Sequence, residues 1–393
     1  MKITFVTDTY PPQPNGVANS LQRLVEGLRK RNHEVDVIRP AALGSDEEGM
    51  EVPSVALPKY REIRVGIPMR FPLQVRWSRN PPDVIYSATP WPLGTSAIKA
   101  AHALGIPVAS GFHTNFQRYM EHYEFSVLEK TTVKYLRRAH NRSDCTFVPT
   151  HDMIDELSKD GFRNLRVLPK GVDSKLFSPK RRDSALRGEW GAGENSLVAL
   201  YVGRIAAEKN LPLVIRTFIE LEERIPDFRG VLVGDGPKAE ELKKEHSEFI
   251  YPGLKFGEDL ARYYASADLF VFPSTTETFG NVTLEALASG LIVVAYDYVA
   301  AHQHISDGIN GYLAPLHDEE AFLSAAFAAV SGTAPAQTAL RKEARKSARR
   351  VRWSKVVQGF ERDLIELIEE HHPESPALAE HQSKNNQSAS VPP

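Results

Sequence analysis

The chain has 393 residues, of which 42% are hydrophobic and 25% charged, and at about 150 residues per domain this length predicts two domains. The 25 glycines and 27 prolines are scattered along the chain, which excludes a fibrous, low-complexity or wholly disordered protein. The net charge of −2 combines +5 in residues 1–170 with −7 in residues 171–393. A positive surplus of five charges is too small for a nucleic-acid-binding surface, although a basic first half can interact with an anionic surface.

The apolar runs are short. The longest, such as 291–296 and 325–330, fall well below the about 18 residues that a membrane span needs. The first residues lack the long apolar stretch of a signal peptide, because Asp8 and two prolines follow almost at once. We therefore expect a cytoplasmic protein that can associate peripherally with the inner face of the membrane. The single cysteine, Cys145, lies in an apolar stretch and is expected to be a buried, inert thiol.

The first half alternates apolar strands with helical segments. Residues 1–7 predict a buried strand, 8–16 a proline-rich loop, and 17–31 a helix with apolar residues at helical spacing. Further strands are expected at 34–38, 84–87, 108–110, 146–148 and 166–169. Because each lies near a helical segment, the pattern predicts a parallel sheet wrapped by helices.

The same alternation starts again at residue 197. Strands are expected at 197–203, 231–234, 269–272 and 292–295, so a second α/β domain follows the first. We place the boundary at residue 170, where an apolar strand gives way to a glycine turn. The predicted fold class is α/β, with doubly wound, Rossmann-like domains at 1–170 and 171–353. Such folds bind ligands at the carboxyl ends of their strands.

The region 336–371 is charged and predicts a long helical segment. Five apolar residues in its later part have spacings suited to one face: Val356, Phe360, Leu364, Ile365 and Ile368. That face needs a partner surface, and we expect a helix at 354–372 that returns to the first domain. The stretch 373–393 is polar and is expected to be a disordered tail without chemistry.

Two cations follow the strand at 197–203. Arg204 and Lys209 are five residues apart at a strand-to-helix turn. At such a turn both side chains can reach a diphosphate while the amides of the helix N-terminus face the same anion. Alone, such a pair is more often an Arg and a Lys in a solvated surface loop.

Two carboxylates follow the strand at 269–272. Glu277 and Glu285 are eight residues apart, about two helical turns, so one precedes a helix and the other lies on its second turn. Gly280 allows backbone amides to approach a ligand, and a carboxylate on such a helix can accept both hydroxyls of a ribose. Either glutamate alone is more often a helix cap or an exposed charge. Combined with the Arg–Lys pair, they indicate a nucleotide site.

These two elements, with the N-terminal loop that ends in Asn15-Gly16-Val17, resemble the retaining glycosyltransferases of the GT-B fold, family four. The resemblance runs from residue 1 to about residue 368. It implies GT-B architecture, in which two Rossmann-like domains face each other across a cleft. It also implies transfer of a hexose from a nucleotide-diphosphate sugar to an acceptor hydroxyl, with the first domain on the acceptor side and the second holding the donor.

The resemblance assigns roles to residues of the second domain. Arg204 and Lys209 would hold the donor diphosphate and stabilise the charge that grows as the glycosidic bond breaks. Glu285 would hold the ribose. Glu277 would contact hydroxyls of the transferred sugar, together with backbone amides of Phe279, Gly280 and Asn281.

In the first domain, the resemblance implies that Gly16 lets its loop approach the phosphates and that His113 lies near the donor sugar. A histidine alone would be structural more often than not. Transfer with retention is commonly pictured as front-side attack, in which the departing phosphate oxygen takes the acceptor proton and no side-chain nucleophile is needed. The sequence has no Asp-x-Asp pair, the usual metal ligand of the other large glycosyltransferase fold, so we predict no metal and no cofactor.

A different class of protein remains as an alternative, namely one that binds NAD or a nucleotide sugar without transfer. Gly234-Asp235-Gly236 follows a strand and mimics a dinucleotide fingerprint. However, the third glycine is replaced by Ala239, and Pro237 alters the turn, so we do not expect NAD binding. The intact Arg–Lys and Glu–Glu elements also argue against a protein without transfer activity.

The acceptor is indicated by a basic segment. Residues 58–79 contain six cations and one acid, interleaved with aromatic side chains, and a second basic run lies at 130–142. An anionic membrane attracts such mixtures by about 1 kcal/mol per cation, although a solvated helix face is an equally good interpretation. Segments 113–142 and 277–282 resemble family members that glycosylate lipids. We therefore expect a glycolipid acceptor, with mannose from GDP-mannose or a sugar from a UDP donor; the alternative is a soluble sugar or polysaccharide acceptor.

Overall fold

The computed structural model describes residues 1–13, 15–41, 49–57, 60–113, 126–277 and 280–371, with the backbone alone for 57, 60–63 and 126–132. It divides into two compact units. Of the described residues, the first contains Met1–His113, Val127–Leu168 and residues 357–371, and the second contains Pro169–Val356. The chain thus leaves the first unit at Leu168 and re-enters it near its C-terminal end.

The first unit is built on a parallel sheet. Its strands lie in the order β3-β2-β1-β6-β7-β8-β9. They are β1 (Lys2–Val6), β2 (Glu34–Pro40), β3 (Met50–Val52), β6 (Val84–Ser87), β7 (Val108–Gly111), β8 (Cys145–Val148) and β9 (Leu165–Val167). Ile3 pairs with Val35 on one side and Val84 on the other, so the strand order reverses at β1. The predicted strands of the first half are confirmed.

Helices and a small hairpin complete the first unit. They are α1 (Gly16–Arg29), α2 (Arg70–Arg79), α3 (Pro92–Leu104), α5 (Ser126–His140), α6 (His151–Lys159) and the antiparallel pair β4 (Ser54–Leu57) and β5 (Tyr60–Gly66). The Asn15 side chain caps α1 by accepting a hydrogen bond from Ala18 N at 2.9 Å. The apolar residues of α1 face the sheet, and Leu21 and Leu28 are fully buried. Cys145 is buried as predicted, and burial raises its pKa to about 12.

The second unit has a parallel sheet with strands in the order β12-β11-β10-β13-β14-β15. They are β10 (Leu197–Val202), β11 (Phe228–Val233), β12 (Ile250–Gly253), β13 (Leu269–Phe272), β14 (Ile292–Tyr296) and β15 (Tyr312–Ala314). In chain order this is the 3-2-1-4-5-6 arrangement of a Rossmann sheet. The order reverses between β10 and β13, and a ligand is expected outside the carboxyl ends of these two strands.

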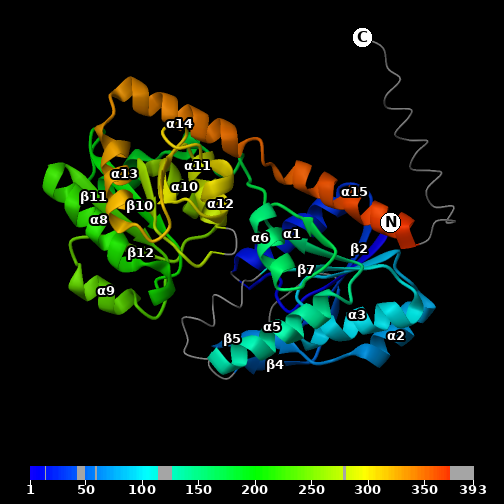
Figure 1. Ribbon diagram of the computed structural model, residues 1–393. Helices are drawn as coiled ribbons and strands as arrows, with labels where there is room; N and C mark the ends of the chain where they lie inside the picture. The colour runs from blue at the N-terminus through cyan, green and yellow to red at the C-terminus, as the bar shows by residue number, and fades with distance from the viewer. Residues whose placement is uncertain (14, 42–48, 58–59, 114–125, 278–279, 372–393) are drawn as a thin grey trace, which may run out of the picture. The chain divides into compact units, whose positions relative to one another are not determined.

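Helices cover both faces of the second sheet (Figure 1). They are α7 (Ser184–Glu189), α8 (Leu211–Arg224), α9 (Ala239–Glu245), α10 (Gly257–Ser266), α11 (Asn281–Ala288), α12 (Val299–His304), α13 (Glu319–Ser331), α14 (Ala334–Ala348) and the short 3-10 helices η1 (Pro179–Arg181) and η2 (Ala207–Lys209). This double cover explains why the strands are apolar on both faces, with Val198, Leu200 and Phe270 fully buried. The predicted pair of Rossmann-like sheets is confirmed.

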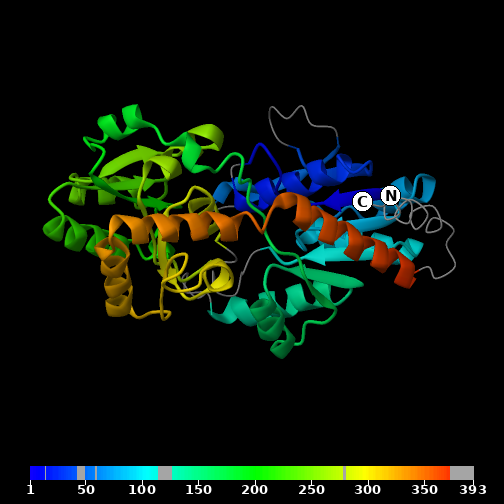
Figure 2. The same cartoon turned by 90° about the horizontal axis from the view of Figure 1, so that it is seen from above.

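The charged C-terminal region forms two helices rather than one, because the chain leaves helical geometry between α14 and α15 (Trp353–His371). Most of α15 packs on the first unit (Figure 2). The ring of Phe360 lies 5.1 Å from that of Tyr86 and 5.0 Å from that of Phe147. Three residues of the predicted apolar face, Val356, Phe360 and Leu364, are buried as expected. The other two, Ile365 and Ile368, are only half-buried, and Leu367 is buried instead.

A buried ion pair also holds α15. Glu361 accepts hydrogen bonds from Nε of Arg31 at 2.7 Å and from Nε2 of His33 at 2.6 Å. The Met1 ammonium donates to Nδ1 of His33 at 3.1 Å, which leaves the imidazole proton on Nε2.

The stretch 373–393, expected to be a disordered tail, lies outside the described residues. Within the described part of the chain, no helix combines the length and the hydropathy that a membrane span requires.

Candidate active site

The candidate site of the second unit lies at the carboxyl edge of its sheet, where the strand order reverses. The loop after β10 carries Arg204 and Lys209, and the loop after β13 carries Glu277. Because β10 and β13 are adjacent parallel strands, both loops emerge at the same edge. The topology therefore brings together two motifs that are about 70 residues apart in the sequence.

Lys209 and Glu277 are in direct contact. Nζ of Lys209 donates a hydrogen bond to Oε1 of Glu277, and both side chains are largely buried, with 14% and 17% of their surface exposed. Ser274 Oγ donates to the same carboxylate oxygen at 3.0 Å, and the Tyr298 hydroxyl donates to the Glu277 carbonyl at 3.2 Å. Two side chains thus orient the Glu277 carboxylate, and a third hydrogen bond holds its backbone.

Arg204 is held beside a buried acid. Its Nη1 lies 3.6 Å from Oε1 of Glu208, whose side chain is only 4% exposed, while the arginine side chain is 36% exposed. Thr276 Oγ1 donates to the Glu208 carbonyl at 2.9 Å, which ties the loop after β13 to the loop after β10. The Tyr201 hydroxyl donates to the Arg204 carbonyl at 3.0 Å. The Arg204 guanidinium is therefore partly exposed to solvent, while hydrogen bonds hold the backbone of its loop at Arg204 and at Glu208.

A helix N-terminus lies beside Glu277. Gly280 has a φ of +89° as the cap residue of α11, a conformation that L side chains rarely adopt. Asn281 follows as the first helical residue, and its Oδ1 is buried without a hydrogen-bond partner among the described residues. Such an oxygen can accept a hydrogen bond from a ligand hydroxyl. Phe279, also expected here, lies outside the described residues.

Glu285 lies on the second turn of α11. The Tyr264 hydroxyl donates to its Oε2 at 3.0 Å. Burial raises the pKa of Glu285 to about 7, although the tyrosine hydrogen bond acts in the opposite direction. The carboxyl group therefore titrates near neutral pH, and its ionised form, with acceptors on both oxygens, is the form suited to both hydroxyls of a diol.

The Gly234–Gly236 loop contacts the Arg204 loop through backbone atoms. A Cβ at Gly234 would lie 1.9 Å from the Gly203 carbonyl oxygen, and one at Gly236 would lie 2.3 Å from that of Ile205. Ile205 N also donates to the Asp235 carbonyl at 2.9 Å. These glycines therefore allow close packing of two loops, which explains a glycine pattern that resembles a dinucleotide fingerprint.

The first unit holds the other two predicted residues. Gly16 begins α1, directly after the Asn15 cap. His113 follows β7, and its Nε2 lies 2.7 Å from the hydroxyl of Tyr86 at the end of β6. Complete burial raises the pKa of Tyr86, so the phenol stays protonated and forms this hydrogen bond as a neutral group. The histidine ring is thereby oriented from inside the unit.

Sequence reasoning missed the residues that orient the site. Tyr86, Tyr264, Ser274 and Tyr298 each bond to a predicted residue. Three of them are tyrosines whose partners are 21 or 27 positions away, so no local spacing marks them. The only available signal was a hydroxyl-bearing residue near the carboxyl end of a strand, as for Tyr86 and Ser274.

The described residues contain no cluster of three or more His, Cys, Asp or Glu side chains that could hold a metal ion.

Comparisons with known proteins agree with this architecture. Residues 14–176 match the model for Glycosyltransferase Family 4, and residues 196–367 match that for Glycosyl transferases group 1. In fold, the chain resembles HepE from Anabaena, solved in complex with UDP, with a TM-score of 0.73 and 20% identity over 93% of this chain and 100% of that one.

Curated relatives are more similar in sequence. A GDP-mannose-dependent alpha-mannosyltransferase of Corynebacterium glutamicum is 34% identical over 83% of this chain and 79% of its own. An alpha-monoglucosyldiacylglycerol synthase of Streptococcus pneumoniae is 29% identical over 80% and 75%, respectively. With both of its halves matched by family models and a relative of this similarity, the chain belongs to the family 4, group 1 glycosyltransferases of the GT-B fold, which are nucleotide-sugar-dependent enzymes.

Proposed function

We propose that this glycosyltransferase is a retaining, metal-independent hexosyltransferase that moves mannose from GDP-mannose to the hydroxyl of a membrane lipid. The second unit serves as the nucleotide-sugar-binding domain, and the first unit serves as the acceptor-side domain. The observation that carries the proposal is the contact between Lys209 and Glu277 at the point where the strand order reverses.

The charges at this edge suit a leaving diphosphate. Arg204 and Lys209 supply two cations, which stabilise the negative charge that develops on the phosphate oxygen as the glycosidic bond breaks. In the donor-free structure their charges are balanced by Glu208 and Glu277. The carboxylate of Glu277 and the unpartnered Oδ1 of Asn281 are acceptors for hydroxyls of the transferred sugar.

The nucleoside is held further along α11. Glu285 accepts hydrogen bonds from both ribose hydroxyls, and Tyr264 fixes the orientation of its carboxylate. In the first unit, Gly16 allows its loop to approach the phosphates, and the His113 ring, oriented by Tyr86, contacts the transferred sugar. These roles divide the site into a diphosphate clamp, a sugar pocket and a ribose acceptor.

The donor and the anomeric outcome follow from the relatives. The mannosyltransferase of C. glutamicum is named for GDP-mannose and an alpha product. Because the mannose of GDP-mannose is itself alpha-linked, an alpha product means retention of configuration. The attack then occurs from the face of the leaving group: the acceptor oxygen bonds to the anomeric carbon, the carbon–phosphate oxygen bond breaks, and the departing phosphate oxygen takes the acceptor proton. The sequence has no Asp-x-Asp pair, which supports a mechanism without a metal.

The lipid acceptor is supported by the surface of the first unit. Four exposed apolar side chains occur between β4 and α2, namely Val55 (64% exposed), Ile67 (37%), Phe71 (76%) and Val75 (53%). Arg64, Arg70 and Arg79 lie exposed in the same stretch. Apolar side chains that insert among lipid chains, flanked by cations that face anionic headgroups, are typical of a peripheral membrane surface. Lys59 and Arg61 of the predicted basic segment lie outside the described side chains.

A transfer assay tests the proposal. The protein is incubated with GDP-mannose or UDP-glucose in EDTA, together with vesicles that contain diacylglycerol or phosphatidylinositol or with a soluble mannoside. We expect mannosylated lipid whose anomeric proton signal in NMR is that of the alpha anomer. Loss of activity in EDTA would contradict metal independence, a beta product would contradict retention, and turnover of the soluble mannoside alone would contradict the lipid acceptor.

A further inference from the structure

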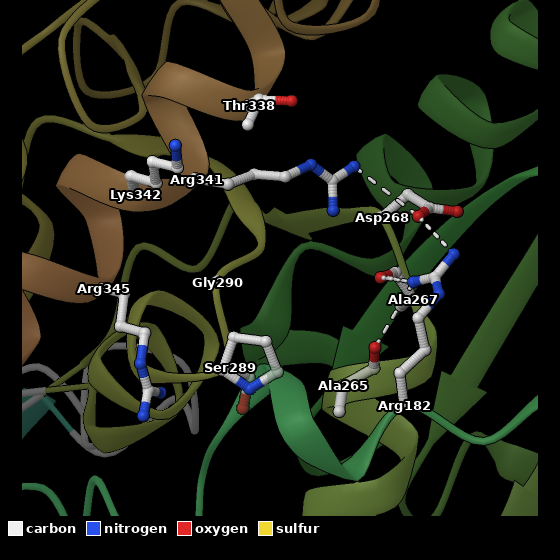
Figure 3. A pocket seen from close by; sticks show the side chains of 11 residues that line it. Arg182, Ala265, Ala267, Asp268, Ser289, Gly290, Thr338, Arg341, Lys342 and Arg345 are labelled. Atoms are coloured by element: carbon white, nitrogen blue, oxygen red, sulfur yellow. Dashed lines mark hydrogen bonds and ion pairs between the residues drawn. The ribbon is translucent and has the colours of Figure 1, made fainter. Parts of the chain in front are cut away.

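A second pocket, seen from close by in Figure 3, lies at the amino ends of β13 and β14, whereas the candidate active site lies at the carboxyl ends of β10 and β13. Its volume is about 440 Å³. Asp268 and Ser289 line it from the segments directly before β13 and β14, which are the amino ends of these strands. Arg182 lines it from the segment after η1, and Arg341 and Lys342 line it from α14. Nothing in the proposed transfer reaction uses this edge.

The pocket holds more positive charge than its single acid can balance. Oδ1 of Asp268 accepts a hydrogen bond from Arg182 at 3.0 Å and lies 3.5 Å from Nη2 of Arg341. Oδ2 of the same carboxylate accepts from Arg187, behind the pocket, at 3.0 Å. Three guanidinium groups therefore share one carboxylate, and the exposed Lys342 and the guanidinium of Arg345 add two further cations. Other acids of these segments have other partners: Asp183 pairs with Arg262, and Glu343 pairs with Lys346.

The cations differ in how firmly they are engaged. Arg182 also donates to the carbonyls of Ala265 and Ala267, and Arg345 donates to the carbonyl of Ala288, so both have a structural role. Among the residues that the structure describes, Arg341 has only the long contact with Asp268, and Figure 3 shows its side chain extending across the pocket. Burial lowers the pKa of Arg341, and the neighbouring guanidinium groups act in the same direction, whereas Asp268 opposes them.

A buried hydroxyl provides a separate indication of a ligand. Ser289 is 3% exposed and lines the pocket, and its Oγ has no hydrogen-bond partner among the described residues. Most buried polar atoms in folded proteins are hydrogen-bonded, so an unpartnered hydroxyl in a cationic pocket is a donor without its acceptor. The remaining lining is largely small or apolar, as expected for a shaped binding site.

We propose that this pocket binds a soluble, phosphate-bearing anion through Arg341, Lys342 and the Ser289 hydroxyl. A phosphate group offers several oxygens and up to two negative charges, which matches a guanidinium, an ammonium and a hydroxyl donor. The volume lies within the range of small-molecule sites, so it admits a phosphorylated metabolite as well as phosphate itself. The site is separate from the donor site and does not depend on the proposed transfer reaction.

The experiment is a calorimetric titration with inorganic diphosphate, carried out with the full chain in the presence of saturating GDP or UDP. The nucleotide occupies the donor site, so the remaining binding reports the second pocket. We compare the natural protein with an Arg341→Gln, Lys342→Gln variant. The matched control is Lys346→Gln, which removes a cation from the same helix outside the pocket.

We expect one diphosphate to bind, at least tenfold more weakly in the double variant, unchanged in Lys346→Gln, and more weakly as salt is raised. The double variant should melt at the same or a higher temperature than the natural protein in diphosphate-free buffer, because it removes surplus positive charge. Absence of binding, or equal binding by the double variant, overturns the proposal.

A second measurement needs no variant. Diphosphate should protect Lys342 from acetylation while Lys346 stays reactive, and equal labelling of Lys342 with and without diphosphate contradicts the proposal. Phosphatidylcholine vesicles containing phosphatidic acid identify the source of the anion. If diphosphate stays bound when the vesicles are added, the ligand is a soluble anion, as proposed. If the vesicles displace diphosphate, the pocket binds a lipid headgroup, and the proposal of a soluble ligand is overturned.

Discussion

Nζ of Lys209 donates a hydrogen bond to Oε1 of Glu277, 68 positions further along the chain. The bond joins the two loops that follow β10 and β13, the adjacent strands at which the order of the sheet reverses. Each residue holds the other in place before any donor arrives. A donor diphosphate would meet a lysine whose position is already defined, which lowers the reorganisation needed during the reaction.

The first prediction concerns this lysine. Lys209→Ala removes a cation from the leaving group and releases the Glu277 carboxylate, so we expect kcat to fall by about 10²-fold or more. Circular dichroism and the melting temperature should remain close to those of the natural protein. Lys243→Ala, an exposed lysine on α9, is the matched control and should retain full activity. Turnover of Lys209→Ala within twofold of the natural protein would falsify the assignment.

The second prediction concerns pH and Glu285. Its pKa of about 7 means that the ionised form, which accepts both ribose hydroxyls, rises from about a tenth at pH 6 to about nine tenths at pH 8. Nucleoside diphosphate should therefore bind about tenfold more tightly at pH 8 than at pH 6. Glu285→Gln should lose this dependence. The phosphate of the ligand also titrates in this range, but it does so equally for the natural protein and for Glu285→Gln. The ratio of their two affinities at each pH therefore reports the contribution of Glu285 alone. An unchanged ratio across this pH range contradicts the role.

The same group predicts a stability profile. The pKa of Glu285 is raised from 4.5 to about 7 in the folded protein, so the folded state binds more protons than the unfolded state between these values. Its contribution to the free energy of unfolding is present in full below pH 4.5, is lost as pH rises to about 7, and is constant above that. Urea denaturation at several pH values should show Glu285→Gln gaining stability relative to the natural protein over this interval.

The third prediction concerns Tyr86 as a positioning residue. Tyr86→Phe removes the hydroxyl that is hydrogen-bonded to Nε2 of His113 but keeps the ring, which packs edge-on against Phe5, Phe147 and Phe360. We expect kcat to fall about tenfold with little change in the affinity for nucleoside diphosphate, because the histidine loses its orientation. A structural role alone would lower the melting temperature without changing kcat. Tyr201→Phe serves as a comparison on the second sheet, where it removes the hydroxyl that donates to the Arg204 carbonyl.

The fourth prediction concerns the attachment of α15. Glu361→Gln removes the negative charge that accepts hydrogen bonds from Arg31 and His33, so we expect a loss of about 2 kcal/mol in the free energy of unfolding. Burial raises the pKa of Glu361, but the hydrogen bonds from Arg31 and His33 outweigh it, and the pKa is lowered overall. The stabilisation is thus present above pH 4.5 and is lost as pH falls through the lowered pKa. Glu366→Gln, on the exposed side of the same helix, should change stability by less than 1 kcal/mol.

The fifth prediction concerns the exposed apolar side chains of the first unit. Phe71→Ser with Val75→Ser should reduce co-sedimentation with anionic vesicles by at least tenfold, because both side chains would otherwise insert among lipid chains. Activity on a water-soluble acceptor analogue should be unchanged. Leu254→Ser with Phe256→Ser removes equally exposed side chains from the second unit and is the control. Equal vesicle binding by both double variants contradicts membrane docking through this surface.

Most of the fold could be predicted because its strands are covered on both faces. A strand such as β10 must be apolar throughout, and that run is visible without any alignment. Both edge strands of the second sheet were missed, as was β3 at the edge of the first. β12 contains Pro252, which argues against a central strand, and β15 has only three residues, too few to show a pattern. The position of an edge strand depends on the neighbour that it pairs with rather than on its own sequence.

The site could be predicted in part for a related reason. Arg204 and Lys209, and likewise Glu277 and Glu285, are close in sequence, so their spacing is visible on a strand-loop-helix unit. The second pocket could not be predicted, because its charges come from Arg182, Asp268 and Arg341, which only the folded sheet and α14 bring together. A local surplus of positive charge depends on which distant residues the fold brings together, and the sequence does not show this.

The close packing at Gly234 and Gly236 bears on how the sequence can change. Neither glycine has a side chain that could touch a substrate, and each lies within a few ångströms of a carbonyl that flanks Arg204. Any larger residue there must displace the backbone on which the arginine is mounted. A saturation library scored by activity would therefore rank these two positions among the least tolerant, and a designer who wishes to alter donor preference should leave them untouched while varying the exposed faces around them.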